Sequence, residues 1–311
     1  MHQRRIRSVA TAAAVFVLSV STLVLVSAES GPSGTSSPAD IDNTTFIDAN
    51  DLLMFVSNTG RFGTDNGGVF GLESGLFYPY TTIADITNGT NAKTVLNAGG
   101  LWLGGVDATT GDTVLALAVF STEYYPGPMD GGSFVTNADT INAYRVYKVY
   151  ADSAEGNPST DYNEWPDSLG APVDGSNRPA FKGEQTLWSV FNDANPATRF
   201  QAGNTAPIGV EVHATFWADN ETFHDSHSIY AKYKLFNKGS RLLNDFYISV
   251  WLDPDLGSAT DDKTGCDSLA QMFFCYNGDD NDLVYGAAPP AVGVKIAGRP
   301  DRTLSRRHCL V

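Results

Sequence analysis

The chain has 311 residues, of which 42% are hydrophobic and 11% aromatic, and it carries a formal net charge of -15. The aromatic content excludes a disordered chain, and the length supports one large or two ordinary domains. Residues 29–298 hold 13 basic and 34 acidic side chains, a net charge of -21. Such a surface excludes nucleic acid and anionic lipid as partners and attracts divalent cations.

Residues 1–28 have the three parts of a secretory signal peptide. Three arginines form a basic start, an uncharged run extends from Val9 to Val26, and small residues end the segment at Ala28. This layout predicts export and cleavage after Ala28. A membrane anchor is the alternative, because the 18 uncharged residues reach the lower limit for spanning a bilayer. No later segment is apolar enough to cross a membrane, so we expect no transmembrane segment after cleavage.

Residues 29–44 are rich in Ser, Pro and Gly and predict a flexible leader, followed by an N-terminal β region over residues 45–150. Within this region Leu101–Gly105 and Thr113–Ser121 flank a short polar turn, which is typical of a β-hairpin. Ile141–Tyr150, dense in Tyr and Val, predicts another strand.

Residues 151–183 contain four prolines and many Asp, Ser and Gly residues, and predict a long loop or a linker between two halves. In residues 184–296, three segments alternate between apolar and polar residues: Gly209–Trp217, Ile229–Phe236 and Phe246–Leu252. Their short connections predict an antiparallel meander with one buried face.

A meander with one apolar face must bury that face, and no long amphipathic helix is available to cover it. The sequence therefore predicts an all-β fold, an antiparallel β-sandwich with long Asp/Gly-rich loops. Residues 45–150 supply either the partner sheet or a first sandwich of their own, so one large or two smaller sandwiches remain open.

Acidic residues gather in the loops that follow the last predicted meander strand. Packing so many carboxylates together raises their pKa values by like-charge repulsion unless a cation neutralises them. Calcium fits, because it accepts six to eight oxygens from carboxylates, amides and carbonyls in irregular loops. The pattern is not an EF-hand, and solvated polar loop tips are the alternative interpretation. The candidate calcium ligands are Asp253, Asp255, Asp261, Asp262, Asp267, Asn277 and Asp279.

Cys266 and Cys275 lie in the same region. In an oxidising compartment they could form a disulfide, and two reduced, buried thiols are the alternative. His224 and His227 could bind zinc only with further ligands such as His213, so an exposed turn is the favoured interpretation.

No catalytic motif is present: the chain has no G-x-S-x-G, no H-E-x-x-H and no P-loop. A glycosidase pair among Glu73, Glu123, Glu164, Glu184 and Glu211 is less favoured than ordinary surface or edge carboxylates.

The tryptophans and tyrosines allow a carbohydrate-binding interpretation, but most aromatic residues on strands pack in a core. Trp217 and Trp251 fall on the faces opposite the apolar stripe, where a second layer explains them as well as a ligand does.

Residues 297–311 break with the preceding composition, since four arginines fall in the last 13 positions. We interpret them as a non-native tail, with a disordered basic tail as the alternative. On the first interpretation the natural protein is longer than this chain.

Several stretches resemble the uncharacterised N-terminal region of large secreted proteins of Bacteroidetes and related bacteria. Many of those proteins look like substrates of the type IX secretion system, so the resemblance implies surface attachment or release. The likeness covers about Asp48 to Val294 and carries no assigned activity. The stretches are Leu101–Gly105, Tyr233–Gly239, Tyr247–Gly257, Thr260–Asp262, Gly265–Asp267 and Cys275–Asp279.

Together these features predict an exported, non-catalytic, calcium-binding β-sandwich module of a longer surface or secreted protein. Adhesion, glycan contact or scaffolding are the expected roles, with a glycan or a cell-surface protein as partner and the extracellular space, the cell surface or the periplasm as location. The alternative is an accessory region of a secreted hydrolase whose catalytic domain is missing from this chain.

Overall fold

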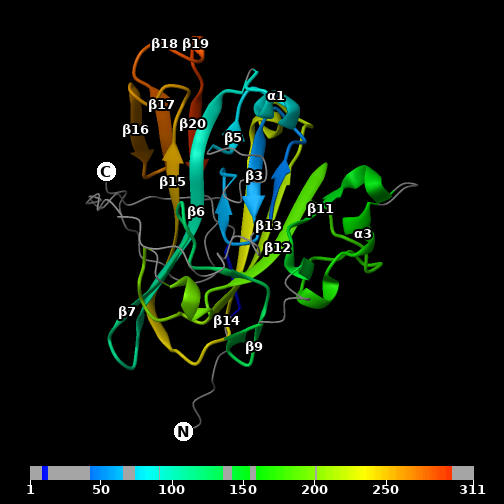
Figure 1. The fold of residues 1–311 in the computed structure, drawn as a ribbon, viewed down its shortest axis with the longest axis vertical. Coiled ribbons are helices and arrows are strands. Elements are labelled where there is room, and N and C mark those ends of the chain that lie inside the picture. Colours follow the sequence, from blue (N-terminus) through cyan, green and yellow to red (C-terminus); the bar gives the residue numbers. More distant parts are fainter. Residues whose placement is uncertain are drawn as a thin grey trace.

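A computed structural model describes residues 9–12, 43–65, 74–90, 92–135, 142–154, 159–199 and 202–295. Apart from Val9–Ala12, the expected signal peptide lies outside these residues, as do nearly all of the expected leader and the whole expected tail. The described chain is dominated by antiparallel strands (Figure 1), which confirms the predicted all-β class.

The first large sheet, called the β6 sheet, is built around one long strand. β6 pairs with β15 along one side, and with β4, β5 and β7 along the other. The β6–β7 pairing confirms the predicted hairpin. The strands in sheet order are β15 (Leu243–Pro254), β6 (Thr94–Asp107), β4 (Arg61–Phe62), β3 (Leu53–Ser57) and β2 (Thr44–Ile47), with β5 (Leu76–Phe77) and β7 (Thr113–Leu117) attached.

The second large sheet, called the β13 sheet, holds most of the remaining long strands. Its central strand β13 alternates as expected and is buried on both faces along nearly its whole length. The strands in sheet order are β1 (Val9–Ala12), β14 (Ile229–Asn237), β13 (Val210–Ala218), β12 (Gln185–Asn192) and β11 (Tyr147–Tyr150), with β8 (Tyr125–Pro126) paired to β12.

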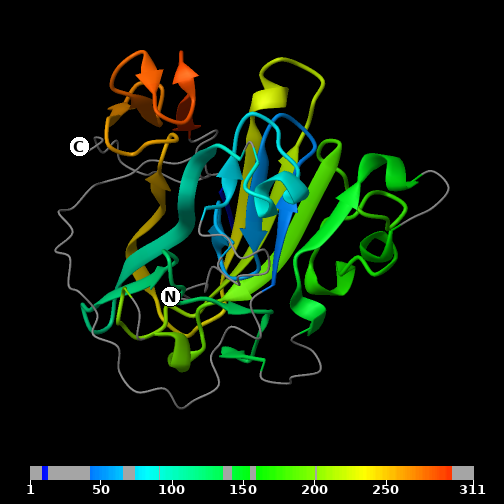
Figure 2. The same ribbon diagram turned by 45° about the horizontal axis from the view of Figure 1, so that its top comes forward.

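The two large sheets face each other across one apolar core. Phe62 of the β6 sheet contacts Phe216 of the β13 sheet, with ring centroids 6.0 Å apart. Leu101 and Leu103 from one sheet join Val212 and other buried residues from the opposite sheet in the same cluster. Figure 2 shows this layering. Residues 45–150 therefore supply most of a partner sheet, and the chain forms one large β-sandwich.

The predicted three-stranded meander is wrong in its last step. β13 and β14 pair as expected, but β15 crosses to the opposite sheet and pairs with β6. Alternation specifies which face of a strand is buried, and both sheets bury their inner face in the same core. The same alternation therefore fits a strand in either sheet, and it does not specify the strand with which β15 pairs.

The expected strand Ile141–Tyr150 is shorter in the structure. Only β11, Tyr147–Tyr150, pairs with β12, while η2 (Asn142–Tyr144) is a turn of 3-10 helix. Side chains replace the ladder hydrogen bonds here: Asn58 Nδ2 donates to the Tyr144 carbonyl, and the Asn43 side chain accepts from the Val146 N–H. Such local bonds compete with strand pairing.

Residues 159–183, called the cover, pack on the outer face of the β13 sheet instead of linking separate halves. Trp165 of the cover and Trp188 of β12 lie in a second small core, with ring centroids 6.4 Å apart. Figure 1 shows α3 beside β11. Besides η2, the helices in the described residues are α1 (Ile83–Thr87), α3 (Thr160–Asn163), η3 (Ala151–Ala154), η4 (Asp167–Leu169), η5 (Pro196–Thr198) and η6 (Asp225–His227).

A third, small sheet follows β15 and lies at one end of the sandwich (Figures 1 and 2). Its inner residues Phe273 and Cys275 join the main core. The third sheet consists of β16 (Asp262–Asp267), β17 (Met272–Asn277) and β20 (Ala291–Lys295). The strands β18 (Asn281–Asp282) and β19 (Gly286–Ala287) form a hairpin between β17 and β20 in the sequence. A separate hairpin consists of β9 (Met129–Asp130) and β10 (Ser133–Phe134).

Candidate cation site at the third sheet

The loop after β15 is fixed against β6 by its own backbone. The N–H of Asp255 donates to the Val95 carbonyl at 3.1 Å, and the N–H of Gly257 donates to Thr94 at 3.1 Å. Between them Leu256 is fully buried in the main core. The Asp255 carboxylate is therefore held in one place although it lies in a loop.

Asp262 begins β16 and lies directly opposite Asn277, the last residue of β17. Directly opposite residues share one face of an antiparallel pair, and Cys275 lies on that face as well. The Leu256 N–H donates to Asp262 Oδ2 at 2.9 Å. The Asp255 loop, the start of β16 and the end of β17 thus meet at one point.

Three buried polar atoms at this junction have no hydrogen-bond partner among the described residues: Asp255 Oδ1, Asp262 Oδ1 and Asn277 Nδ2. The Asp255 carboxylate accepts one bond, from Asn97 Nδ2 at 3.2 Å, through its other oxygen. An unpaired buried carboxylate oxygen is costly, and native structures seldom contain one without an ion or a donor nearby.

Like charges accumulate at the same point. Burial raises the pKa of Asp253, and repulsion from Asp255 adds to this, against a hydrogen bond from Asn97. Burial also raises the pKa of Asp262, followed by repulsion from Asp255, Asp261 and Asp282, while the Leu256 N–H opposes the rise.

The thiol of Cys275 responds to the same negative charge. Burial raises its pKa to about 12, and repulsion from Asp262 and Asp255 contributes. Three separate groups around the junction are thus shifted toward their protonated forms. Burial is the main cause of each shift, and repulsion between the gathered carboxylates adds to it.

Asp282, which is not among the candidate ligands, is a further carboxylate near Asp262. It is 2% exposed and accepts backbone N–H bonds from Ser258, Val284 and Tyr285. Burial opposes its ionisation, but these bonds outweigh burial and lower its pKa. Asn97 was also missed, because it precedes Asp255 by 158 residues in the chain.

The structure places three of the seven candidate ligands, Asp255, Asp262 and Asn277, at the junction, with Asp253 as a charged neighbour of Asp255 and Asp261 as a charged neighbour of Asp262. Asp267 lies at the opposite end of β16, where it accepts the N–H groups of Leu269 and Ala270 in a turn. Asp279 accepts the N–H of Asn281 in an exposed turn. These two residues fit the solvated-loop interpretation.

The atoms at the junction determine which kind of metal ion it could bind. Within the described ranges, no three side chains drawn from His, Cys, Asp and Glu converge as a formed metal centre. A transition-metal site of the zinc type is not supported by that geometry. A calcium site also uses amide and carbonyl oxygens, and the orphaned oxygens of Asp255 and Asp262 are of the hard type that calcium prefers.

Cys266 and Cys275 are free thiols in the structure. Cys266 is opposite Phe273 and Cys275 is opposite Thr264, so the two cysteines are diagonal neighbours. Diagonal Cβ atoms in an antiparallel pair lie about 7 Å apart, well beyond the roughly 4 Å that a disulfide spans.

The other sequence candidates lie apart from this junction. His213 is buried on β13 beside Trp188, with ring centroids 5.4 Å apart. His224 is exposed beside η6, and the ring of His227 lies 4.6 Å from the ring of Phe223 at an interplanar angle of 39°.

The expectation of ordinary surface or edge carboxylates is wrong for two glutamates. Glu123 is fully buried near Arg199, and Glu211 is 2% exposed and bonded to Lys238 at 2.6 Å. In both cases a basic side chain or a backbone N–H compensates the buried charge. Local sequence does not show these partners, because they come from distant parts of the chain. Glu73 lies outside the described residues.

Trp217 and Trp251 both pack on neighbouring side chains. Trp217 stacks on Tyr230 with an interplanar angle of 14°, and Lys182 Nζ lies 5.2 Å from its ring centroid. Trp251 meets Phe120 edge to face. These contacts favour the packing interpretation over an open sugar-binding face.

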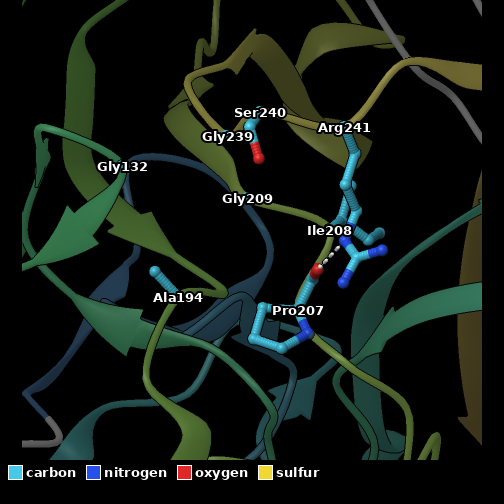
Figure 3. A pocket seen from close by; sticks show the side chains of 8 residues that line it. All are labelled: Gly132, Ala194, Pro207, Ile208, Gly209, Gly239, Ser240 and Arg241. Carbon is cyan, nitrogen blue, oxygen red and sulfur yellow. Dashed lines mark hydrogen bonds between the residues drawn. The ribbon is translucent and has the colours of Figure 1, made fainter. Parts of the chain in front are cut away.

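Figure 3 shows a pocket lined by the turn at Gly132, by the loops on either side of Ala194 and Pro207, and by the turn after β14. Arg241 is the only charged residue in its lining, and its Nε donates to the Pro207 carbonyl at 3.0 Å. The same guanidinium also bonds Asp107. The lining offers no carboxylate, imidazole or amine that could activate the Ser240 hydroxyl, and consists of Gly132, Ala194, Pro207, Ile208, Gly209, Gly239, Ser240 and Arg241.

No family model, no curated protein and no solved structure matches this chain. Among the helices in the described ranges, none is long and apolar enough to cross a bilayer.

Proposed function

We propose that the chain is an exported, non-catalytic β-sandwich module that binds calcium at the junction of Asp255, Asp262 and Asn277, within a longer surface or secreted protein. The observation that supports the site most directly is the pair of buried, unpartnered oxygens on Asp255 and Asp262. A cation between them relieves both the lost hydrogen bonds and the repulsion between the carboxylates.

A cation at this position joins three parts of the chain. It holds the loop after β15, the start of β16 and the end of β17, and so fixes the third sheet to the end of the sandwich. Backbone bonds from Asp255 and Gly257 to β6 already position one side of the junction. Calcium therefore acts as a structural crosslink in this proposal, with Asp253 and Asp261 adding negative charge nearby.

Export is supported by the three arginines and the uncharged run of residues 1–28. Extracellular calcium modules bind with dissociation constants of about 0.1–1 mM. A site of that affinity is filled outside a cell without any special loading step. A role in adhesion or scaffolding is part of the same proposal, supported by the large β-sandwich and its acidic composition.

Isothermal titration with calcium, combined with elemental analysis, tests the site. The wild-type chain should bind one calcium with a dissociation constant of about 0.1–1 mM. The variant Asp255→Asn/Asp262→Asn should lose this binding. The matched control Asp267→Asn/Asp279→Asn removes the same charge from the same sheet and should bind as the wild type does. Equal binding by both double variants, or none by the wild type, refutes the site.

A further inference from the structure

The outer edge of β14 accepts a strand. In the β13 sheet, β14 pairs with β13 on one side and with the four residues of β1 on the other. The β1 pairing is antiparallel and runs from Val9 opposite Phe236 to Ala12 opposite Tyr233. The structure thus contains an example of an extended segment added to this edge, with a defined direction and register.

The segment that covers the edge is the one that the sequence predicts to be removed. Val9–Ala12 lies inside residues 1–28, so cleavage after Ala28 takes β1 away. Alternate residues of β14, which is nine residues long, then present unpaired N–H and C=O groups at the edge. Such an edge is a template for pairing with another chain. This step rests on the export that is part of the proposed function.

The register shows what an incoming strand meets on its inner side. Tyr233 and Leu235 of β14 are 1% and 4% exposed and belong to the main core. The residues paired with them in β1 are Ala12 and Ala10. Apolar residues of an incoming strand at the same register would extend the main core by one strand.

The outer side of the same edge is basic, in a chain with a net charge of -15. Lys232 and Lys234 alternate with the two core residues and are half-buried. Within the described chain, neither lysine forms an ion pair, and neither does Lys182 of the cover. Burial lowers the pKa of Lys232, and repulsion from Lys182 and Lys234 adds to this. Three basic groups therefore face one another without a carboxylate partner.

We propose that the processed protein binds an extended, antiparallel strand at β14, in which small apolar residues alternate with Asp or Glu. The apolar positions lie opposite Tyr233 and Leu235, and the acidic positions lie opposite Lys232 and Lys234. The backbone bonds supply the affinity and the alternating side chains supply the selectivity, as in other cases of strand addition. The alternative is that the lysines only protect the edge against pairing.

The test uses the full chain, exported from a bacterial host, with its N-terminus read by intact mass. The probe is a capped nine-residue peptide in which Ala or Val alternates with Glu, followed by fluorescence anisotropy. The processed protein should bind it in the micromolar range, and the unprocessed chain should bind at least about tenfold more weakly because β1 occupies the edge. A peptide N-methylated on its edge-facing amides should not bind.

Charge reversal separates strand addition from edge protection. Lys232→Glu/Lys234→Glu should weaken binding of the Glu peptide about tenfold and favour a peptide with Lys in place of Glu. The matched control Lys263→Glu/Lys295→Glu changes two exposed lysines on the third sheet and should leave binding unchanged.

Three results overturn the inference: no binding by the processed wild type at millimolar peptide, equal binding of the N-methylated peptide, or retention of residues 1–28 on the exported protein. Loss of the calcium site would leave these results unaffected, since binding is measured with and without chelator. The two proposals can therefore fail separately.

Discussion

Replacing Asp262 by Asn should reverse the order of stability between calcium-free and calcium-loaded protein. In chelator, the substitution removes a carboxylate whose pKa is raised by burial and by repulsion from Asp255, Asp261 and Asp282. An Asn at this position still accepts the Leu256 N–H, and it gains an N–H₂ group for the unpaired oxygen of Asp255. We expect the variant to equal or exceed the wild type by about 1 kcal/mol without calcium.

With calcium the order should invert. A ligand at about 100 times its dissociation constant stabilises the folded state by about 2.7 kcal/mol, which corresponds to about 5–10 °C in melting temperature for a domain of this size. At a dissociation constant of about 0.1 mM, 10 mM calcium reaches that ratio. The wild type should gain this shift, and the Asp262→Asn variant should gain little because it loses a charged ligand.

The pH dependence of the calcium-free comparison gives a second check. The raised pKa of Asp262 means that the folded state binds this proton more tightly than the unfolded state. The cost of burying its charge is therefore present at neutral pH and disappears as the pH falls below the ordinary aspartate pKa of 3.8. The advantage of Asp262→Asn in chelator should shrink over that range.

Differential scanning fluorimetry measures the melting temperatures of both proteins in chelator and in about 1–10 mM calcium, at several pH values. Magnesium serves as the ionic-strength control, because its strict octahedral geometry and strong hydration disfavour an irregular site. If the wild type and Asp262→Asn shift equally with calcium, the reasoning about the junction is wrong.

Three further substitutions test the packing around the sandwich. Gly170→Ala should cost about 2 kcal/mol in urea unfolding, because residue 170 has φ of +93° and an added Cβ would lie 2.6 Å from His213 Cε1. Lys238→Met should cost about 2 kcal/mol at pH 7, since Glu211 stays buried after losing its ion pair. Burial opposes ionisation of Glu211, but bonds from His213 and Lys238 outweigh it and lower its pKa, so the cost should fall as the pH drops below 4.5. Leu256→Ala should cost about 3 kcal/mol by thermal unfolding, with or without calcium, because the side chain is fully buried.

The sequence predicted the faces of the strands better than their neighbours. Alternation in β13 and β14 correctly separated core positions such as Val212 and Leu235 from the outer face. The same alternation in β15 gave the right buried residues, Val250 and Leu252, but the wrong sheet. The strand with which β15 pairs depends on the connection before it and on its register with residues far away in the sequence. The residue pattern of a single strand contains neither.

The candidate site divides in the same way. Asp255 lies near both Asp253 and Asp262 because all three residues flank the connection between β15 and β16, a short distance along the chain. Asp267 is separated from them by the length of β16, and Asp279 bonds to the backbone of its own turn. Local sequence density showed where carboxylates gather, but only the strand register showed which of them face the same side.

The proposed calcium site and the proposed export together make folding depend on location. Before export, at a low free calcium concentration, a site with a dissociation constant near 0.1–1 mM would be empty, so the repulsion at Asp255 and Asp262 would act against docking of the third sheet. Residues 9–12 cover the β14 edge in the same state. If both proposals hold, calcium would fix the third sheet after export, and removal of the signal peptide would open the edge. The ability to associate with a partner would then depend on arrival outside the cell.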